Sequence, residues 1–351
     1  MLTDIFARRY EGTVLWETFE EKDRQFLVQA FRIISEQFHP YYNHAYGSED
    51  PGSKKYWGML NDKLSLELGL ETLSAKAYSY PLAIQGTTTN QVGTYSLLNV
   101  CKNFVCGTYI SSIPADRFMK ERISFIEIAF REREYEIDAE IESWNSSYVG
   151  RRLEHGMQAA IQITPTKFEG KETFAERKRA PFLSAVTELN TRFSQANYDL
   201  HYHNGFIQRS TDQLTEEQIE DPFWSLVSDA MWKNVDTDMK EAIDRRDNQG
   251  RDPALYAAKA LESAIKIISI HKRWTTGHEK GVQYYLDNLG SKKNKYINDW
   301  EKESLKIFFG NVRNPLGHGP GNEPMPELTL QQTDWAIEFC MIWIKTLIRR
   351  F

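Results

Sequence analysis

The chain has 351 residues, of which 41% are hydrophobic and 13% aromatic, and its formal net charge is −6 at pH 7. This composition is typical of a folded globular protein and excludes a disordered chain or a general polycation, so any nucleic-acid site must be a local basic patch. The length allows two domains with separate cores. No apolar run is long enough for a signal peptide or a membrane helix, and we expect a cytoplasmic protein that makes no membrane contact.

The N-terminal half is predicted to be mainly helical. The fourth expected helix has the clearest pattern, because Ile123, Ile126 and Phe130 belong to an apolar stripe among Arg and Glu residues that can pair four positions apart. Polar turns separate the helices, and residues 86–93 are expected to form one of them. The expected helices cover residues 16–38, 56–73, 95–105, 117–144 and 182–196.

Residues 197–208, NYDLHYHNGFIQ, are predicted to form a β-hairpin. Aromatic residues alternate along this segment, and Asn204-Gly205 is typical of a two-residue turn with positive φ at both positions. His201 and His203 would share one strand face, where a structural role is favoured over metal binding because a third ligand is lacking. The polar run that follows, up to Pro222, indicates a boundary between an N-terminal domain of residues 1–211 and a C-terminal domain of residues 212–351.

The C-terminal domain is predicted to be a bundle of closely spaced helices. Asp252-Pro253 is a typical helix start, and Leu261 and Ile268 share the apolar face of the helix that follows. A Thr-x-x-Gln capping box precedes the last helix. The expected helices cover residues 223–246, 253–271, 277–289, 296–312 and 330–350. The fold class is therefore mainly α, with an α-rich N-terminal domain that contains a small β-hairpin and a C-terminal helical bundle.

The most distinctive stretch, GNVRNPLGHGPGNEPMP, lies between the last two helices. Its glycines and prolines are expected to end the preceding helix at Arg313, and Pro315 biases Asn314 away from the helical region. Arg313, Asn314 and His318 would then converge on one loop. Three such residues are enough for one reaction in particular, the cleavage of RNA. RNA supplies its own nucleophile, the 2′-OH, so its cleavage needs only a proton acceptor, a proton donor and a cation. His318 can move the proton, Arg313 can bind two phosphate oxygens, and Asn314 can orient the substrate or the His.

These residues resemble the HEPN superfamily, whose signature is an Arg followed after four to six residues by a His, with a polar residue directly after the Arg. The stretch from Arg313 to His318 matches this signature, with Asn314 as the polar residue. Two other Arg-to-His pairs, which begin at Arg32 and Arg273, have a suitable spacing, but an apolar residue follows each arginine. Asn314 therefore distinguishes the match from spacing that arises by chance.

The same loop resembles the C-terminal domain of bacterial abortive-infection proteins, in which Arg-Asn and His-Gly flank a turn that contains Gly. The upstream sequence Ala-Leu-Glu-x-x-x-Lys looks like that domain too, and it contributes Glu262 and Lys266 as supporting residues of the site. Glu262 can pair with Arg313, or it can form only a surface pair with Lys266 four residues along the helix.

The N-terminal stretch with Phe6, Arg8 and Tyr10, together with the hairpin, is similar to the AbiJ-type N-terminal domain that often precedes it. The two resemblances imply a toxin-type, anti-phage endoribonuclease that uses no metal or cofactor and leaves 2′,3′-cyclic phosphate ends. They also imply a homodimer through the C-terminal domain, with two motifs facing each other. The N-terminal domain would be a sensor or regulator for a phage-derived trigger or an antitoxin, because it has no phosphate-binding Gly loop, nucleophile elbow or metal-ligand spacing.

Lys272, Arg273 and Lys280 cluster around a Trp-Thr-Thr-Gly turn and are candidates for RNA binding. An ordinary solvated basic loop fits the same residues equally well. The catalytic interpretation also has alternatives: Arg313 could cap a helix end, or the domain could be an inactive RNA- or nucleotide-binding module, or an interaction module, of a defence system. The presence of Arg, Asn and His together favours the enzyme.

Overall fold

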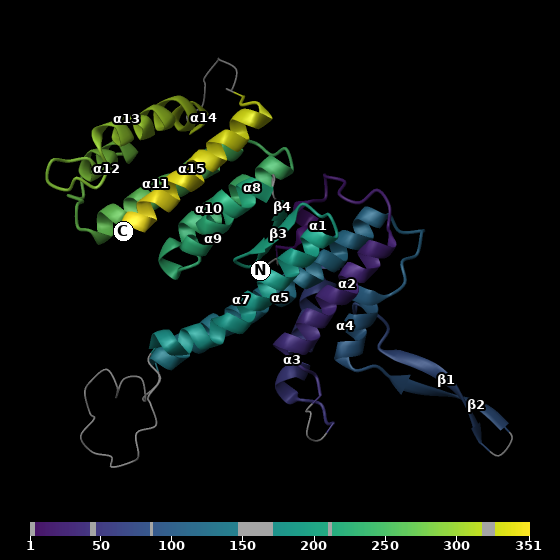
Figure 1. Cartoon of the computed structure of the whole chain (residues 1–351). Coiled ribbons are helices and arrows are strands. Elements are labelled where there is room, and N and C mark those ends of the chain that lie inside the picture. Colours follow the sequence, from purple (N-terminus) through teal and green to yellow (C-terminus); the bar gives the residue numbers. More distant parts are fainter. Residues whose placement is uncertain (1–3, 43–46, 85–86, 147–170, 210–212, 318–326) are drawn as a thin grey trace, which may run out of the picture. The chain divides into compact units, whose positions relative to one another are not determined.

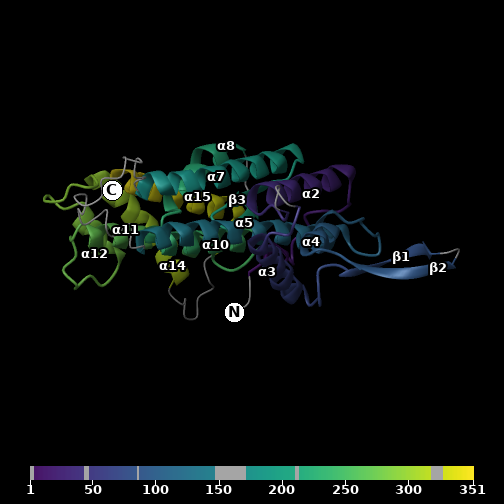
Figure 2. The ribbon, with the colours of Figure 1, turned by 90° about the horizontal axis from the view of Figure 1, so that it is seen from below.

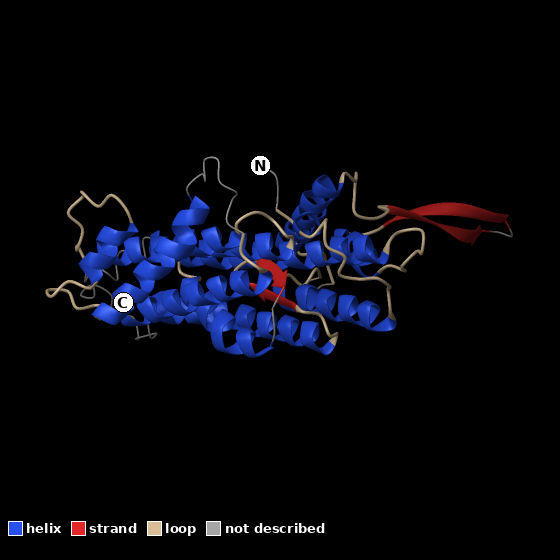
Figure 3. Cartoon of the chain, turned by 90° about the horizontal axis from the view of Figure 1, so that it is seen from above, coloured by secondary structure: helices blue, strands red, loops and turns tan. Residues whose placement is uncertain are grey.

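The structure is a computed structural model that describes residues 4–42, 47–84, 87–146, 171–209, 213–317 and 327–351. Helices make up most of these residues and the strands form two small hairpins, so the predicted mainly α fold is confirmed (Figure 3). The chain divides into two compact units, Met1–Ile207 and Gln208–Phe351. This division lies four residues before the boundary expected between residues 211 and 212.

Unit 1 consists of helices and hairpins, and the expected helices are present with shifted ends (Figure 1). The largest shift is in the last helix, which begins at Lys171 and runs through Pro181. The elements are α1 (Phe6–Arg9), α2 (Glu21–Ile33), the π-helix η1 (Ile34–Phe38), α3 (Pro51–Leu68), β1 (Ala77–Ile84), β2 (Thr87–Thr94), α4 (Leu97–Cys106), α5 (Ala115–Ser146), α7 (Lys171–Gln195), β3 (Leu200–His203) and β4 (Phe206–Arg209).

The core of unit 1 forms around α5. Ile123 and Phe130, both predicted to lie on its apolar stripe, are completely buried, and burying a side chain of this size contributes roughly 1.5–3 kcal/mol. Helices α5 and α7 lie side by side (Figures 1 and 2). They run antiparallel, because Lys178 pairs with Glu140 while Phe182 packs against the earlier Phe130.

A buried ionic cluster fixes the β3–β4 hairpin in unit 1. The Glu127 carboxylate is completely buried and accepts hydrogen bonds from Arg131 at 2.8 Å, from Arg9 at 2.5 Å and from the Ile207 N–H at 2.8 Å. Arg131 also donates to the Gly205 carbonyl at 2.7 Å. The predicted hairpin is therefore confirmed, and it is held by a charged network as well as by its turn.

The β1–β2 hairpin contradicts the turn predicted at residues 86–93. Strand β2 pairs with β1 along its whole length, with Tyr78 opposite Gly93. The ring of Tyr78 covers Gly93 so closely that a Cβ atom there would lie 2.5 Å from the ring. Gly93 is thus a strand glycine under an aromatic ring, and the neighbouring threonines favour the extended backbone. Figure 2 shows this hairpin extending away from the helices of unit 1.

In the part of unit 2 that the structure describes, the regular elements are helices apart from the end of β4. The single helix expected over residues 223–246 is interrupted, because Asp229 has an extended backbone and its side chain caps a new start by accepting the Met231 N–H at 2.8 Å. The elements are α8 (Gln213–Thr215), the π-helix η2 (Glu216–Glu220), α9 (Asp221–Val227), the 3₁₀ helix η3 (Ala230–Trp232), α10 (Lys233–Asp247), α11 (Pro253–His271), α12 (Val282–Leu289), α13 (Asp299–Phe308), the π-helix η4 (Phe309–Arg313), α14 (Asn314–Gly317) and α15 (Leu330–Arg350).

Helix α11 is the centre of unit 2. It packs against α10, α12, α15 and η4, and Figure 1 shows α15 running beside it. Leu261, Ile265 and Ile268 are completely buried, and the ends of α11 and α15 are those predicted. The polar residues on the less buried side of α11 are therefore held in place by a helix that is packed against several others.

Candidate active site

The segment with the predicted catalytic residues stays helical. Helix α13 continues into η4 and then into α14, so the predicted break at Arg313 is wrong, and Asn314 has the helical φ and ψ values of −67° and −44°. The wider π turn lets the Asn314 N–H bond to the Phe309 carbonyl five residues back. Pro315 is the second residue of α14, and the wider π turn before it keeps the chain helical although the proline has no N–H to donate. Turns of this kind are frequent at functional sites.

Arg313 is the last residue of η4, and 27% of its side chain is exposed. One Nη donates to a Glu262 carboxylate oxygen at 3.3 Å, and the other lies 3.5 Å from Oδ1 of Asn314. The buried Nε has no hydrogen-bond partner among the described atoms. Because a guanidinium has five N–H donors, these two long contacts leave Arg313 with donors for an anion.

Glu262, on α11, is 9% exposed and holds two cations. Its Oε1 accepts from Lys266 at 2.7 Å, while Oε2 accepts from Arg313. The two pairings that the sequence left open therefore occur together. One carboxylate shared by two cations fixes the edge of the guanidinium and leaves the three side chains with a net positive charge.

His318 lies outside the described residues, as do residues 319–326. The backbone that leads to His318 does lie next to the arginine. Gly317 is its immediate neighbour, and a Cβ atom on Gly317 would be 3.4 Å from Nη1 of Arg313. The chain thus enters the His318 segment beside the guanidinium.

The residues predicted to bind RNA are not gathered at this site. Lys272 follows α11, ten residues after Glu262, which places it about 15 Å further along the helix axis. Its Nζ donates to the Phe351 carbonyl oxygen at 2.9 Å and lies 4.8 Å from the centre of the Phe351 ring. Arg273 and Lys280 are exposed. This end of α11 is therefore a separate basic loop, and its first lysine is engaged by the end of the chain.

An acidic residue orders that loop. The Glu279 carboxylate accepts hydrogen bonds from the Thr276 N–H at 2.7 Å and the Gly277 N–H at 3.0 Å, and a third from Asn288 at 3.3 Å. These bonds, the Thr276 N–H first, lower the pKa of Glu279 to about 2. The negative charge of Glu279 therefore persists beside the basic residues at any physiological pH.

Sequence reasoning missed Tyr256 and Lys259, which lie on α11 just before Glu262. The Lys259 ammonium sits 4.1 Å from the centre of the Tyr256 ring. The available signal was the Tyr-x-x-Lys spacing, which puts two side chains on one helix face. That spacing is common, and it becomes relevant here because Glu262, three residues after Lys259 on α11, binds Arg313.

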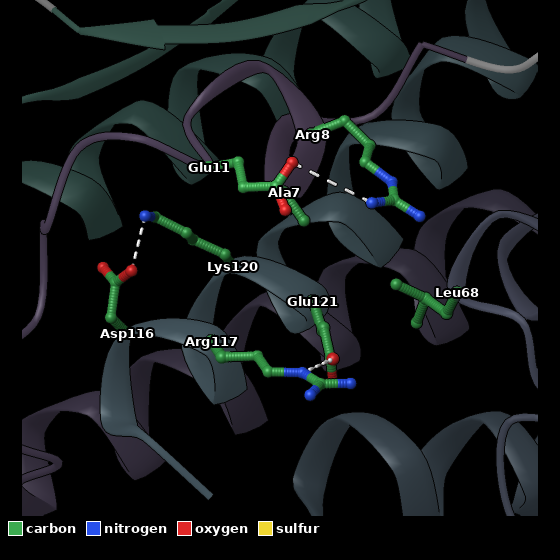
Figure 4. A pocket seen from close by; sticks show the side chains of 8 residues that line it. All are labelled: Ala7, Arg8, Glu11, Leu68, Asp116, Arg117, Lys120 and Glu121. Atoms are coloured by element: carbon green, nitrogen blue, oxygen red, sulfur yellow. Dashed lines mark hydrogen bonds and ion pairs between the residues drawn. The ribbon is translucent and has the colours of Figure 1, made fainter. Parts of the chain in front are cut away.

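A cleft of about 360 Å³ lies elsewhere, in unit 1 (Figure 4). Its charged side chains pair within it: Lys120 with Asp116 at 2.5 Å and Arg117 with Glu121 at 2.9 Å. Lys120 also donates to the Tyr10 carbonyl at 2.6 Å. These charges are satisfied by structural contacts, so the cleft offers little for chemistry.

The fold and site described so far define a mainly helical, two-unit protein with a positively charged cluster at a π turn. Comparison with protein families identifies residues 4–225 as AbiJ N-terminal domain 4. The chain belongs to this family, which connects it with abortive infection, a defence role. The matched region covers unit 1 and extends into α9. Searches of curated proteins and of solved structures found no match. No helix in the described ranges has the length and apolar character needed to cross a membrane.

Proposed function

We propose that the chain is a metal-independent endoribonuclease of the HEPN type, the cytoplasmic toxin of an anti-phage abortive-infection system. The observation that carries this proposal is the placement of Arg313: the buried Glu262 holds one edge of its guanidinium, and the remaining Nη N–H groups of this partly exposed side chain are available for a phosphate. Membership of an abortive-infection family supports the defence context.

In the proposed reaction His318 removes the proton from a ribose 2′-OH, and the 2′ oxygen attacks the adjacent phosphorus. Arg313 stabilises the additional negative charge on the phosphate oxygens, and Asn314 orients the substrate. The P–O5′ bond breaks, and His318 returns its proton to the leaving 5′ oxygen. The products are a 2′,3′-cyclic phosphate and a 5′-hydroxyl. Glu262 and Lys266 position Arg313, and no metal takes part.

The function of unit 1 in this proposal is to restrain the ribonuclease until a phage-derived trigger arrives or an antitoxin is lost. Its described charged cleft is internally paired, which fits a regulator better than a second active site.

The proposal predicts a homodimer through the C-terminal domain. Trp335 and Ile342 of α15 are 52% and 42% exposed, and Phe339 between them stacks on Phe308 of α13 at 4.5 Å. We call these four residues, Phe308, Trp335, Phe339 and Ile342, the apolar face. Since α13 leads directly into η4, a second copy packed on the same face would bring two Arg313 segments near one two-fold axis.

Sedimentation of the full chain tests the dimer. We expect the wild type to be a dimer, and Trp335→Ala with Ile342→Glu to give a folded monomer that has lost RNA cleavage. Ile270→Glu, at a residue 60% exposed on α11, is the matched control and should remain dimeric. A wild type that stays monomeric, or a double variant that dimerises like the wild type, contradicts the interface.

Incubation of total RNA with EDTA tests the activity. The wild type should cut, while Arg313→Ala and His318→Ala should leave the RNA intact, and the exposed Arg349→Ala is the control. If the wild type binds RNA without cutting it, the inactive binding module becomes the better account. If both site variants still cut, the assignment of the site is wrong.

A further inference from the structure

Four side chains on α11 and α12 lie on either side of the Glu262 anchor. Tyr256, Lys259 and Lys266 lie on α11 at positions i, i+3 and i+10, which share one face of a helix. Tyr285 of α12 lies beside Lys266, with 5.9 Å between the ammonium and the ring centre. We call these four residues the α11 strip. It has a tyrosine–lysine pair at each end, and Arg313 is held between the pairs.

Lys259 is the most available cation of the strip. Among the described residues it has no carboxylate within ion-pair distance, and its ammonium rests on the Tyr256 ring. A guanidinium from α10, that of Arg245, also lies against this ring at 4.2 Å, but Glu241 holds it at 2.6 Å. An aromatic ring binds a lysine less strongly than a carboxylate does, so Lys259 can turn to a phosphate at small cost.

Asp238 of α10 also interacts electrostatically with Lys259, without forming an ion pair. Burial raises the pKa of Asp238, although the charge of Lys259 and a hydrogen bond with Ser263 act in the opposite direction. At the other end of the strip, Lys266 shares Glu262 with Arg313. The strip together with Arg313 therefore has three cations, Lys259, Lys266 and Arg313, against the two carboxylates of Glu262 and Asp238.

We propose that the α11 strip binds a single strand of RNA and leads it past Arg313. This inference rests on the proposed ribonuclease function, and it names the form of substrate that the site accepts. The strip spans the eleven residues from Tyr256 to Lys266 of α11, about 15 Å along the helix axis. Lysines bind phosphates, while tyrosine rings stack on bases, and only unpaired bases offer their faces to a ring. A duplex cannot use the two tyrosines.

The strip is better placed than the basic loop of Lys272, Arg273 and Lys280. Lys272 is engaged by Phe351, and the loop begins about 15 Å from Glu262 along α11. Lys259 precedes Glu262 by three residues and Lys266 follows it by four, so both cations lie within about two turns of the Arg313 anchor.

Fluorescence anisotropy with a 2′-O-methyl oligonucleotide tests the strip, because this probe cannot be cleaved through a 2′-OH. The full-length chain should bind the single strand, and Lys259→Gln should weaken binding about threefold to tenfold and reduce the salt dependence by the contribution of roughly one phosphate contact. Tyr256→Leu should weaken binding about fivefold or more by loss of stacking. The exposed Lys293→Gln, in the loop after α12, is the matched control and should bind like the wild type.

The outcomes separate the strip from the ribonuclease proposal. Three results together support the strip, whether or not natural RNA is cut. Lys259→Gln binds the single strand more weakly than the wild type, Lys293→Gln binds it as the wild type does, and a duplex probe binds more weakly than the single strand. Wild-type binding that Lys259→Gln leaves unchanged overturns the strip, even if the protein cuts RNA. Absence of wild-type binding to the single strand overturns it as well. Failure of the wild type to cut natural RNA, with strip-dependent binding intact, overturns only the ribonuclease.

Discussion

Arg313 is positioned by a carboxylate 51 residues earlier in the sequence. The Arg-Asn pair and the helix that contains Glu262 could both be predicted from the sequence. That Glu262 binds Arg313 and Lys266 together could not, because helix spacing fixes only the contact with Lys266. The contact with Arg313 depends on how η4 packs against α11, and the same packing places Lys259 and Tyr256 near the site.

The shape of the Arg313 side chain should matter as much as its charge. Arg313→Lys keeps the positive charge but replaces a planar fork with a point charge, so one ammonium must satisfy both Glu262 and the phosphate. We expect cleavage to fall about 100-fold with little change in melting temperature. Cleavage of a labelled RNA measures this, and a Lys variant within threefold of the wild type would show that only charge is needed.

Glu279 should make the loop at residues 276–279 sensitive to acid. Its pKa in the folded protein, about 2, lies below the ordinary 4.5. The stabilisation is therefore complete above about pH 4.5 and is lost as the pH falls towards 2. In the wild type, the Thr276 and Gly277 amides should be strongly protected from hydrogen exchange at pH 5 and little protected at pH 2. In Glu279→Gln both amides should lack this protection at both pH values. Equal protection in the variant at pH 5 would mean that the carboxylate does not order the loop.

Two of the departures from the predicted elements involve Pro and Gly. Pro315 favours a helix end when residues are considered singly, yet a π turn lets the chain stay helical. Gly86 and Gly93 favour a turn, yet Gly93 lies in a strand because the Tyr78 ring needs the space. Both outcomes depend on partners distant from the residue itself, whereas α11 and α15 were predictable because their caps and apolar faces are local.

The π turn offers a test at this scale. Pro315→Ala restores an N–H and removes the ring that prevents a regular α-helical path, so η4 can shorten by one residue and rotate Arg313 away from Glu262. We expect cleavage to fall several-fold while the melting temperature stays equal or rises. The exposed Gly310→Ala, where an added Cβ meets nothing within 4 Å, is the control for a general effect on this helix. Unchanged cleavage in Pro315→Ala would separate the π turn from the site.

The ionic cluster of unit 1 should dominate the stability of its second hairpin. Glu127→Gln keeps the size of the side chain but removes the buried negative charge that Arg9 and Arg131 share, although Arg9 keeps its contact with the more exposed Asp4. Breaking such a pair costs about 3–5 kcal/mol. Chemical denaturation, followed by a spectroscopic signal that reports the unfolding of unit 1, measures this loss of stability. A loss of stability below about 1 kcal/mol would mean that the hydrogen bonds from Arg131 to backbone carbonyl oxygens are enough to hold the hairpin.

For the whole molecule, composition and periodicity predicted the mainly α fold class, and the family match supports the defence context. A partner for the N-terminal unit could not be predicted from the sequence, because the segment of its β1–β2 hairpin between Ala77 and Thr94 has no charged side chain that would indicate a chemical class of ligand. The proposed function of the whole protein requires that the C-terminal unit cuts RNA by attack of the 2′-OH, with Arg313 and His318 as the acting residues.

The chemistry of the cut ends is the most direct measurement. A synthetic single-stranded RNA is incubated with the wild-type protein in EDTA, and its products are compared with those of the same strand carrying 2′-deoxy residues at the cut positions. The account predicts 2′,3′-cyclic phosphate and 5′-hydroxyl ends, no cutting of the deoxy-substituted strand, and no products with Arg313→Ala. Ends with a 5′-phosphate, or equal cutting of the deoxy-substituted strand, would contradict it.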